Sequence, residues 1–273
     1  GLKGDDSSTS SGLIVPKPQD ATQYYIFTVD EPHHNNSAAF PNEAANDGVN
    51  DGLTYSKVNI NDAGGLGAVD ATEKNIPLIT YDTTNPLHVD FKSSEKITAV
   101  KADDCSSFWI ITHFVDTFYA FKIDENGVNT TPVISTVGPI IPVEGYRRNA
   151  LGYLKASPDG TKLISANFGE GTIAGQDAGG GIYLFDFDND LGVVSNAVEL
   201  YSAQNNNSPY GVEFSAENRK AYATVGLGIN GGGNSQVLQW DLESADIPNS
   251  LQVIHTSSAF SAGALQLGVD RKI

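Results

Sequence analysis

The stretch of sequence that decides the fold is Tyr153-Leu154-Lys155-Ala156-Ser157-Pro158-Asp159-Gly160-Thr161-Lys162-Leu163-Ile164-Ser165-Ala166. A short apolar run reaches the turn Ser157-Pro158-Asp159-Gly160, and a second apolar run follows from Lys162 to Ala166. Proline, aspartate and glycine favour tight turns, whereas apolar and β-branched residues favour strands. The stretch therefore predicts two antiparallel strands joined by a turn.

Two further apolar segments follow this hairpin, and the set of four recurs along the chain. The third segment, Tyr183-Leu184-Phe185-Asp186, ends in an aromatic residue and an acid, and the fourth covers residues 197–201. When the first segments are aligned, one polar residue falls at equivalent positions, spaced by 54, 58 and 53 residues: Lys101, Lys155, Glu213 and Gln266. Lys17 occupies the same position in an earlier copy, 84 residues before Lys101.

A repeat of about 50 residues with four strands is typical of a β-propeller blade. The predicted fold class is therefore all-β, a β-propeller of four-stranded antiparallel blades; a β-sandwich is the alternative, but it does not predict such a repeat. Four full blades begin near residues 13, 95, 150 and 209, and a partial fifth begins at Gly263. Because propellers close into rings, we expect 1–273 to be a single domain of a longer chain with about seven blades.

The charge balance excludes some classes of partner. The 273 residues carry 33 acidic and 16 basic side chains, a formal net charge of −17. Such a chain is not expected to bind nucleic acid or an anionic membrane surface, which both attract basic proteins. No apolar run approaches the roughly 18 residues of a membrane span. Cys105 is the single cysteine, so no internal disulfide is expected.

Several stretches resemble the propeller found near the N-terminus of Bacteroidota surface proteins exported by the type IX secretion system. They span most of the chain in order: 11–18, 24–30, 52–56, 74–78, 95–100, 151–160, 210–215 and 263–268. The resemblance implies a secreted or outer-surface protein, the secretion machinery as a partner, and adhesion or gliding motility as context. It supplies no catalytic residues.

The recurring polar position suggests a site in the propeller channel. First strands line the central channel, so Lys17, Lys101, Lys155, Glu213 and Gln266 are expected to face the axis. Ammonium, carboxylate and amide groups that converge there would bind a ligand or an ion. The alternative is that these groups pair with one another and only solvate the channel.

A second candidate surface follows from the loops at one end of the predicted ring. Loops between blades, and loops between second and third strands, emerge on the same face, and binding residues often lie on such loops. This face is expected to gather the glycine-rich loops 169–180 and 226–234 and the ligand-binding candidates Tyr146, Arg147, Arg148 and Asn167. Mixed aromatic, amide and guanidinium groups suit polar partners such as glycans or peptides.

Calcium is the ion that the sequence suggests. Asp47, Asn50 and Asp51 lie in an oxygen-rich loop, and calcium prefers such ligands. The run 186–192 also begins like a calcium loop, but Leu191 replaces the required glycine, so we interpret it as a turn. The glycine pattern 226–231 leads into another strand rather than a helix, which argues against a dinucleotide site.

The leading functional hypothesis is a non-catalytic binding or adhesion module for a glycan or protein partner. One alternative is a lactonase-like propeller hydrolase with a channel metal site, in which Glu213 is the likeliest member. Short segments such as 157–163 and 185–188 resemble sequences of lactonase-type propellers. A second alternative is a structural spacer within a large surface adhesin.

Overall fold

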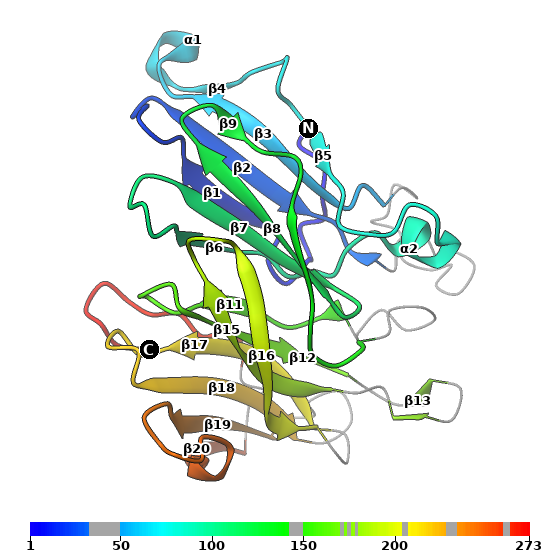
Figure 1. The fold of residues 1–273 in the computed structure, drawn as a ribbon, viewed down its shortest axis with the longest axis vertical. Helices are drawn as coiled ribbons and strands as arrows, with labels where there is room; N and C mark the ends of the chain where they lie inside the picture. The colour runs from blue at the N-terminus through cyan, green and yellow to red at the C-terminus, as the bar shows by residue number, and fades with distance from the viewer. Residues whose placement is uncertain are drawn as a thin grey trace.

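The structure is a computed structural model of the chain. It describes residues 1–32, 50–141, 150–169, 172–173, 176–177, 180–203, 207–227, 234–258 and 263–273. Four antiparallel sheets follow one another from top to bottom in Figure 1, each formed by one continuous part of the chain. Tyr146, Arg147, Arg148 and Asp47, which the sequence analysis singled out, lie outside the described residues.

The first sheet contains five strands. Its elements in chain order are β1 (Gly12–Pro16), β2 (Gln23–Val29), β3 (Leu53–Asn59), the short helix α1 (Asp62–Gly65), β4 (Ala68–Val69) and β5 (Ile76–Leu78). β4 and β5 both pair with β3 and so share the place of a fourth strand. The helix α2 (Pro86–Phe91) follows, in a region that the sequence pattern marks only as loop. Asn85 caps this helix through its side chain, which accepts a hydrogen bond from the Leu87 amide.

The second sheet has the strand order β10-β8-β7-β6, with the short β9 paired to β8. Its strands are β6 (Thr98–Lys101), β7 (Phe108–Phe114), β8 (Thr117–Asp124), β9 (Gly127–Val128) and β10 (Val133–Thr136). The apolar runs near 119–124 and 131–135, which correspond to the third and fourth segments of the repeat, are therefore present as β8 and β10 with boundaries shifted by about two residues.

The last two sheets repeat the same order of four strands. The third contains β11 (Leu154–Ala156), β12 (Lys162–Asn167), β15 (Gly181–Asp188) and β16 (Val193–Ser202), with the small hairpin β13 (Thr172–Ile173) and β14 (Gln176–Asp177) between β12 and β15. The fourth contains β17 (Ser208–Phe214), β18 (Lys220–Leu227), β19 (Asn234–Asp241), the 3-10 turn η4 (Pro248–Ser250) and β20 (Gln252–Ser257). The hairpin quoted first, 153–166, is β11 paired with β12.

Three apolar cores lie between consecutive sheets, which is how propeller blades are held together. Phe27 and Tyr55 of the first sheet pack with Phe121 of the second. Trp109 of the second packs with Phe187 of the third, and a third core joins the last two sheets. The first strands contact one another in sequence: β1, β6, β11 and β17. The all-β propeller fold with four blades is therefore confirmed.

The C-terminal segment differs from the prediction. A fifth first strand was expected over 264–267, but the structure has no strand within 263–273. The segment instead lies beside β17 and β18, where Thr224 Oγ1 of β18 donates to the Gly263 carbonyl at 2.7 Å and the Leu267 amide donates to Glu213 Oε2 of β17 at 3.1 Å. It pairs with no described strand, and a strand requires such a ladder of backbone hydrogen bonds.

None of the helices within the described ranges is long and apolar enough to cross a membrane.

Candidate functional site

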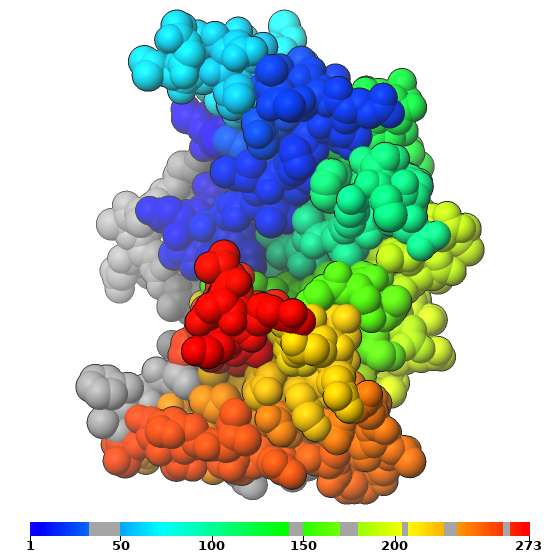
Figure 2. Space-filling model, turned by 90° about the vertical axis from the view of Figure 1, so that its left-hand side faces the viewer, coloured from blue at the N-terminus to red at the C-terminus, as the bar shows by residue number. Residues whose placement is uncertain are grey.

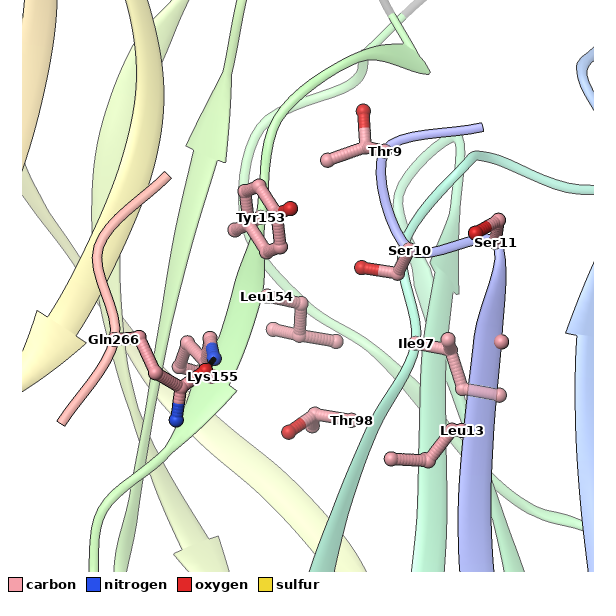
Figure 3. A pocket seen from close by; sticks show the side chains of 11 residues that line it. Thr9, Ser10, Ser11, Leu13, Ile97, Thr98, Tyr153, Leu154, Lys155 and Gln266 are labelled. Carbon is pink, nitrogen blue, oxygen red and sulfur yellow. Dashed lines mark hydrogen bonds between the residues drawn. The ribbon is translucent and has the colours of Figure 1, made fainter. Parts of the chain in front are cut away.

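A pocket of about 330 Å³ opens at the inner edges of the first three sheets. Figure 3 shows its wall, to which the N-terminal segment, β6, β11 and the C-terminal segment all contribute. The lining residues are Thr9, Ser10, Ser11, Gly12, Leu13, Ile97, Thr98, Tyr153, Leu154, Lys155 and Gln266. Hydroxyl groups, one ammonium and one amide dominate its polar lining, so it suits a ligand rich in hydrogen-bonding groups.

One wall of the pocket is the segment that precedes β1. The Thr9 amide and hydroxyl both donate to Glu95 Oε2, at 2.8 and 2.9 Å, and the Ser10 amide donates to the Glu95 carbonyl at 3.1 Å. The Gly152 amide in turn donates to Thr9 Oγ1 at 3.3 Å. These bonds fix the segment to the second and third sheets, and the Ser10 hydroxyl is left to point into the pocket (Figure 3).

The opposite wall brings together three of the five recurring polar residues. Lys155 Nζ lies 3.3 Å from Gln266 Oε1 and 3.5 Å from Glu213 Oε2. The buried Glu213 carboxylate also accepts hydrogen bonds from the Phe214 and Leu267 amides. In the space-filling view of Figure 2 the C-terminal residues, in red, lie between the fourth sheet and the N-terminal residues. Lys155 is therefore held at the pocket edge by Glu213 and Gln266.

The other two recurring residues lie apart from the pocket. Lys101, at the end of β6, is exposed, and Lys17 follows β1, where its charge helps to lower the pKa of Asp20 after the larger effects of hydrogen bonds from Thr22. Neither lines the pocket. The expected ring of polar groups is thus realised as a cluster of three, Lys155, Glu213 and Gln266.

Two buried charged residues lie behind the N-terminal wall. Glu95 is 1% exposed, and burial, with the charge of Glu31, raises its pKa to about 7 against the effect of the Thr9 hydrogen bonds. Burial lowers the pKa of the adjacent Lys96 to about 7, although its ammonium donates to the Ala150 and Leu151 carbonyls at 2.7 and 2.9 Å. Titratable groups with strongly shifted pKa values are common at functional sites, and they also occur in structural networks of charged residues.

A buried histidine completes this polar interior. His113 in β7 has its pKa lowered to about 3 by burial and by the charge of Lys96, so it is neutral under physiological conditions. Its ring packs against Phe118 with centroids 4.6 Å apart. This environment is that of a core residue rather than of a ligand-facing base.

The described part of the predicted calcium loop has structural contacts. Asn50 Nδ2 donates to the Phe91 carbonyl at 2.8 Å, and Asn50 Oδ1 accepts the Gly52 amide. Asp51 forms an ion pair with Lys3 at 2.5 Å. Within the described residues, no three His, Cys, Asp or Glu side chains are grouped so that they would hold a metal ion. The calcium site, which also involves Asp47, stays a prediction.

Asn167 lies at the end of β12, at the position paired with Gly181, and not in the pocket. It is buried, and its Oδ1 has no hydrogen-bond partner among the described residues. The surface proposed around it includes Tyr146, Arg147 and Arg148, which the structure does not describe. That surface therefore stays a prediction.

Sequence reasoning missed the N-terminal wall and Tyr153. The signal available was the hydroxyl run Ser7-Ser8-Thr9-Ser10-Ser11, an unusual composition just before a strand. Its partner, Glu95, lies 86 residues away, and nothing in the local pattern connects the two.

No family model matches the chain, and no curated protein matches it. Solved structures with similar folds include a candidate 6-phosphogluconolactonase of Bacteroides uniformis, 10% identical, with a TM-score of 0.47, over 95% of this chain and 60% of that one.

Two further structures share this likeness. The periplasmic gluconolactonase of Pseudomonas aeruginosa is 13% identical, with a TM-score of 0.47, over 96% of this chain and 63% of that one. Oligopeptidase B of Trypanosoma brucei is 11% identical, with a TM-score of 0.38, over 93% of this chain and 28% of that one. The chain spans about three fifths of the two lactonase-type structures. This likeness concerns the fold, and no residue role is carried over.

Proposed function

We propose that this chain belongs to a secreted or cell-surface β-propeller that binds a glycan, without catalysis, in the pocket at its inner strands. The observation that carries the proposal is the lining: hydroxyl groups of Ser10 and Thr98 stand opposite the ammonium of Lys155 and the amide of Gln266. Sugars offer the matching set of hydroxyl donors and acceptors. A volume of about 330 Å³ falls at the small end of ligand pockets.

The charges at the pocket favour a neutral ligand over an anionic one. Lys155 is balanced locally by Glu213, and the whole chain has a net charge of −17. An anionic ligand would meet long-range repulsion without a free cation to receive it. A neutral glycan avoids this cost and still receives hydrogen bonds from Lys155.

The exported, surface-displayed setting is part of the proposal and rests on the sequence resemblance to type IX secretion cargo. Adhesion or gliding would then be the process that glycan binding serves, and the secretion machinery would be a transient partner. A protein partner at the loop-bearing face, near Asn167, is the second form of this binding hypothesis.

The test compares two equivalent lysines. The purified protein is screened against an array of neutral and acidic oligosaccharides, and hits are measured by calorimetry. Lys155→Met should weaken binding by about tenfold to a hundredfold, the effect of losing one charge-assisted hydrogen bond. Lys101→Met, at the equivalent but exposed position in β6, should leave affinity unchanged.

Two outcomes would contradict the proposal. Equal effects of the two substitutions would place the ligand away from the pocket. Hydrolysis of gluconolactone that requires an added divalent metal and disappears in Glu213→Gln would support the lactonase-like alternative instead.

A further inference from the structure

Three aromatic side chains run in a row from the pocket. Tyr153, which lines the pocket, meets Tyr210 edge-to-face, with ring centroids 5.5 Å apart and planes at 89°. Tyr210 meets Phe168 in the same way, at 6.4 Å and 88°. All three are half-buried, so each ring keeps part of its surface in contact with solvent.

The backbone fixes this row in place. The Tyr153 amide donates to the Tyr210 carbonyl at 2.9 Å, which joins the start of β11 to β17. The Phe168 amide donates to the Leu151 carbonyl at 3.1 Å. The register of β17 against β18 shifts between Pro209 and Val212, and Tyr210 lies within that irregularity. Irregularities of this kind redirect side chains and are common beside binding sites.

The two outer rings are not part of the apolar cores between the sheets. The three apolar cores of the described structure include Tyr153 as a peripheral member, but neither Tyr210 nor Phe168. Tyr210 lies next to the polar wall: burial raises the pKa of its hydroxyl, and the nearby Thr9 side chain partly opposes this shift. Aromatic rings held at the surface beside a polar pocket are available to a ligand.

We propose that Tyr210 and Phe168 form a second sugar subsite that continues the pocket, so that the site takes a chain of β-linked neutral pyranoses rather than a single sugar. This inference rests on the proposed glycan-binding function. β-linked pyranoses with equatorial hydroxyls present apolar C–H faces, which pack on aromatic rings, while their hydroxyls remain at the edges. One ring would occupy the pocket beside Lys155, and the next would pack on Tyr210 and Phe168.

The experiment measures how affinity depends on chain length. Calorimetry is performed with gluco-, xylo- and N-acetylglucosamine oligosaccharides, all β-1,4-linked, of one to six units. In the unmodified protein the affinity should rise about tenfold or more from the monosaccharide to the disaccharide and then level off, because the site has two sugar subsites. Tyr210→Ala should remove most of this rise and leave monosaccharide affinity unchanged, because Tyr210 does not line the pocket.

Matched variants keep the inference falsifiable. Tyr210→Phe retains the ring and should retain the rise. Phe168→Leu should reduce it partly, and it serves as the deciding variant if Tyr210→Ala does not fold. Tyr24→Ala, at a half-buried tyrosine of β2, is the control for loss of a surface tyrosine.

The outcomes separate this inference from the proposed function. If monosaccharides bind in a Lys155-dependent way and Tyr210→Ala keeps the chain-length dependence, the second subsite is wrong while the pocket stands. If no oligosaccharide of the three series binds, the second subsite is wrong; if the wider array of oligosaccharides also yields no ligand, the proposed function is wrong as well.

Discussion

Trp240→Ala is expected to lower the free energy of unfolding by about 3–5 kcal/mol, the range found when a buried aromatic side chain is truncated. Trp240 is among the largest fully buried side chains, at 0% exposure, in the core between the third and fourth sheets. Ala221 lies opposite it on β18. Neighbours as small as alanine cannot close the resulting cavity, so the lost contacts are not recovered.

Urea unfolding of the unmodified protein and of Trp240→Ala measures this effect. Both the midpoint of the transition and the dependence of the free energy on urea concentration are compared. Trp240→Phe is the informative companion, since the Trp240 Nε1 hydrogen has no partner among the described residues and is buried at a cost. Removing this unpaired N–H donor offsets part of the lost packing. We therefore expect Trp240→Phe to lower the free energy of unfolding by about 1 kcal/mol or less.

Trp109→Phe is the matched control. Trp109 Nε1 donates to the Asn189 carbonyl at 2.8 Å, and Lys122 Nζ lies 5.4 Å from the ring centroid. The phenylalanine variant loses the hydrogen bond and weakens the cation–π contact, so it should be the more destabilising of the two Trp→Phe changes. A larger loss for Trp240→Phe would show that the indole nitrogen of Trp240 does find a partner.

Glu95→Ala is expected to cost about 2–5 kcal/mol, because it leaves two buried hydrogen-bond donors without their acceptor. The change leaves the Thr9 amide and hydroxyl without their acceptor and Lys96 without its neighbouring carboxylate. Glu95→Gln keeps an acceptor oxygen and the side-chain volume, so its cost should be much smaller. Thermal and urea unfolding at pH 7 distinguish the two.

The pH dependence gives this prediction a second readout. Burial and Glu31 raise the folded-state pKa of Glu95 to about 7, whereas the unfolded-state value is near 4.5. Between these values the native state holds a proton that the unfolded state has released, so the contribution of Glu95 to stability falls as pH rises from 4.5 to 7. The stability of the unmodified protein relative to Glu95→Gln should therefore decline across this window.

Other titratable groups nearby contribute in the same way to the unmodified protein and to Glu95→Gln. To first order they therefore cancel in the stability difference between these two proteins. His113, with its pKa lowered to about 3, raises stability as pH rises up to 6.5, and Lys96, with its pKa lowered to about 7, raises it as pH rises up to 10.5. A difference between the two proteins that stays constant from pH 4.5 to pH 7 would mean that Glu95 is already ionised at the lower end.

Much of the fold was predictable because the sequence patterns that mark the strands and turns of each blade are local. The apolar run 108–112, which corresponds to the second segment of the repeat, forms most of β7, and the predicted hairpin at 153–166 is the pair β11–β12. Each depends on turn residues and apolar runs that the chain presents within about ten residues. The C-terminal segment was mispredicted because its apolar residues, 264–267, resemble a first strand but find no strand to pair with.

The candidate site was predictable only in part. The repeat marked Lys155, Glu213 and Gln266 as equivalent positions, and the structure brings them together. It also marked Lys101, which is exposed at the end of its short strand. Equivalent positions in a repeat share a backbone environment but not their neighbours, so the repeat alone could not tell which of them meet.

The sequence by itself determined the strands, their order, the four-strand repeat and the acidic character of this chain, since these follow from residue type and spacing. Only the tertiary structure decided that Thr9 meets Glu95 and that Lys155 meets Gln266, across 86 and 111 residues. The physical reason is that periodicity fixes which face a side chain occupies, whereas contacts between blades depend on how whole sheets pack. The pocket and the aromatic row beside it are formed only by this packing of sheets against one another.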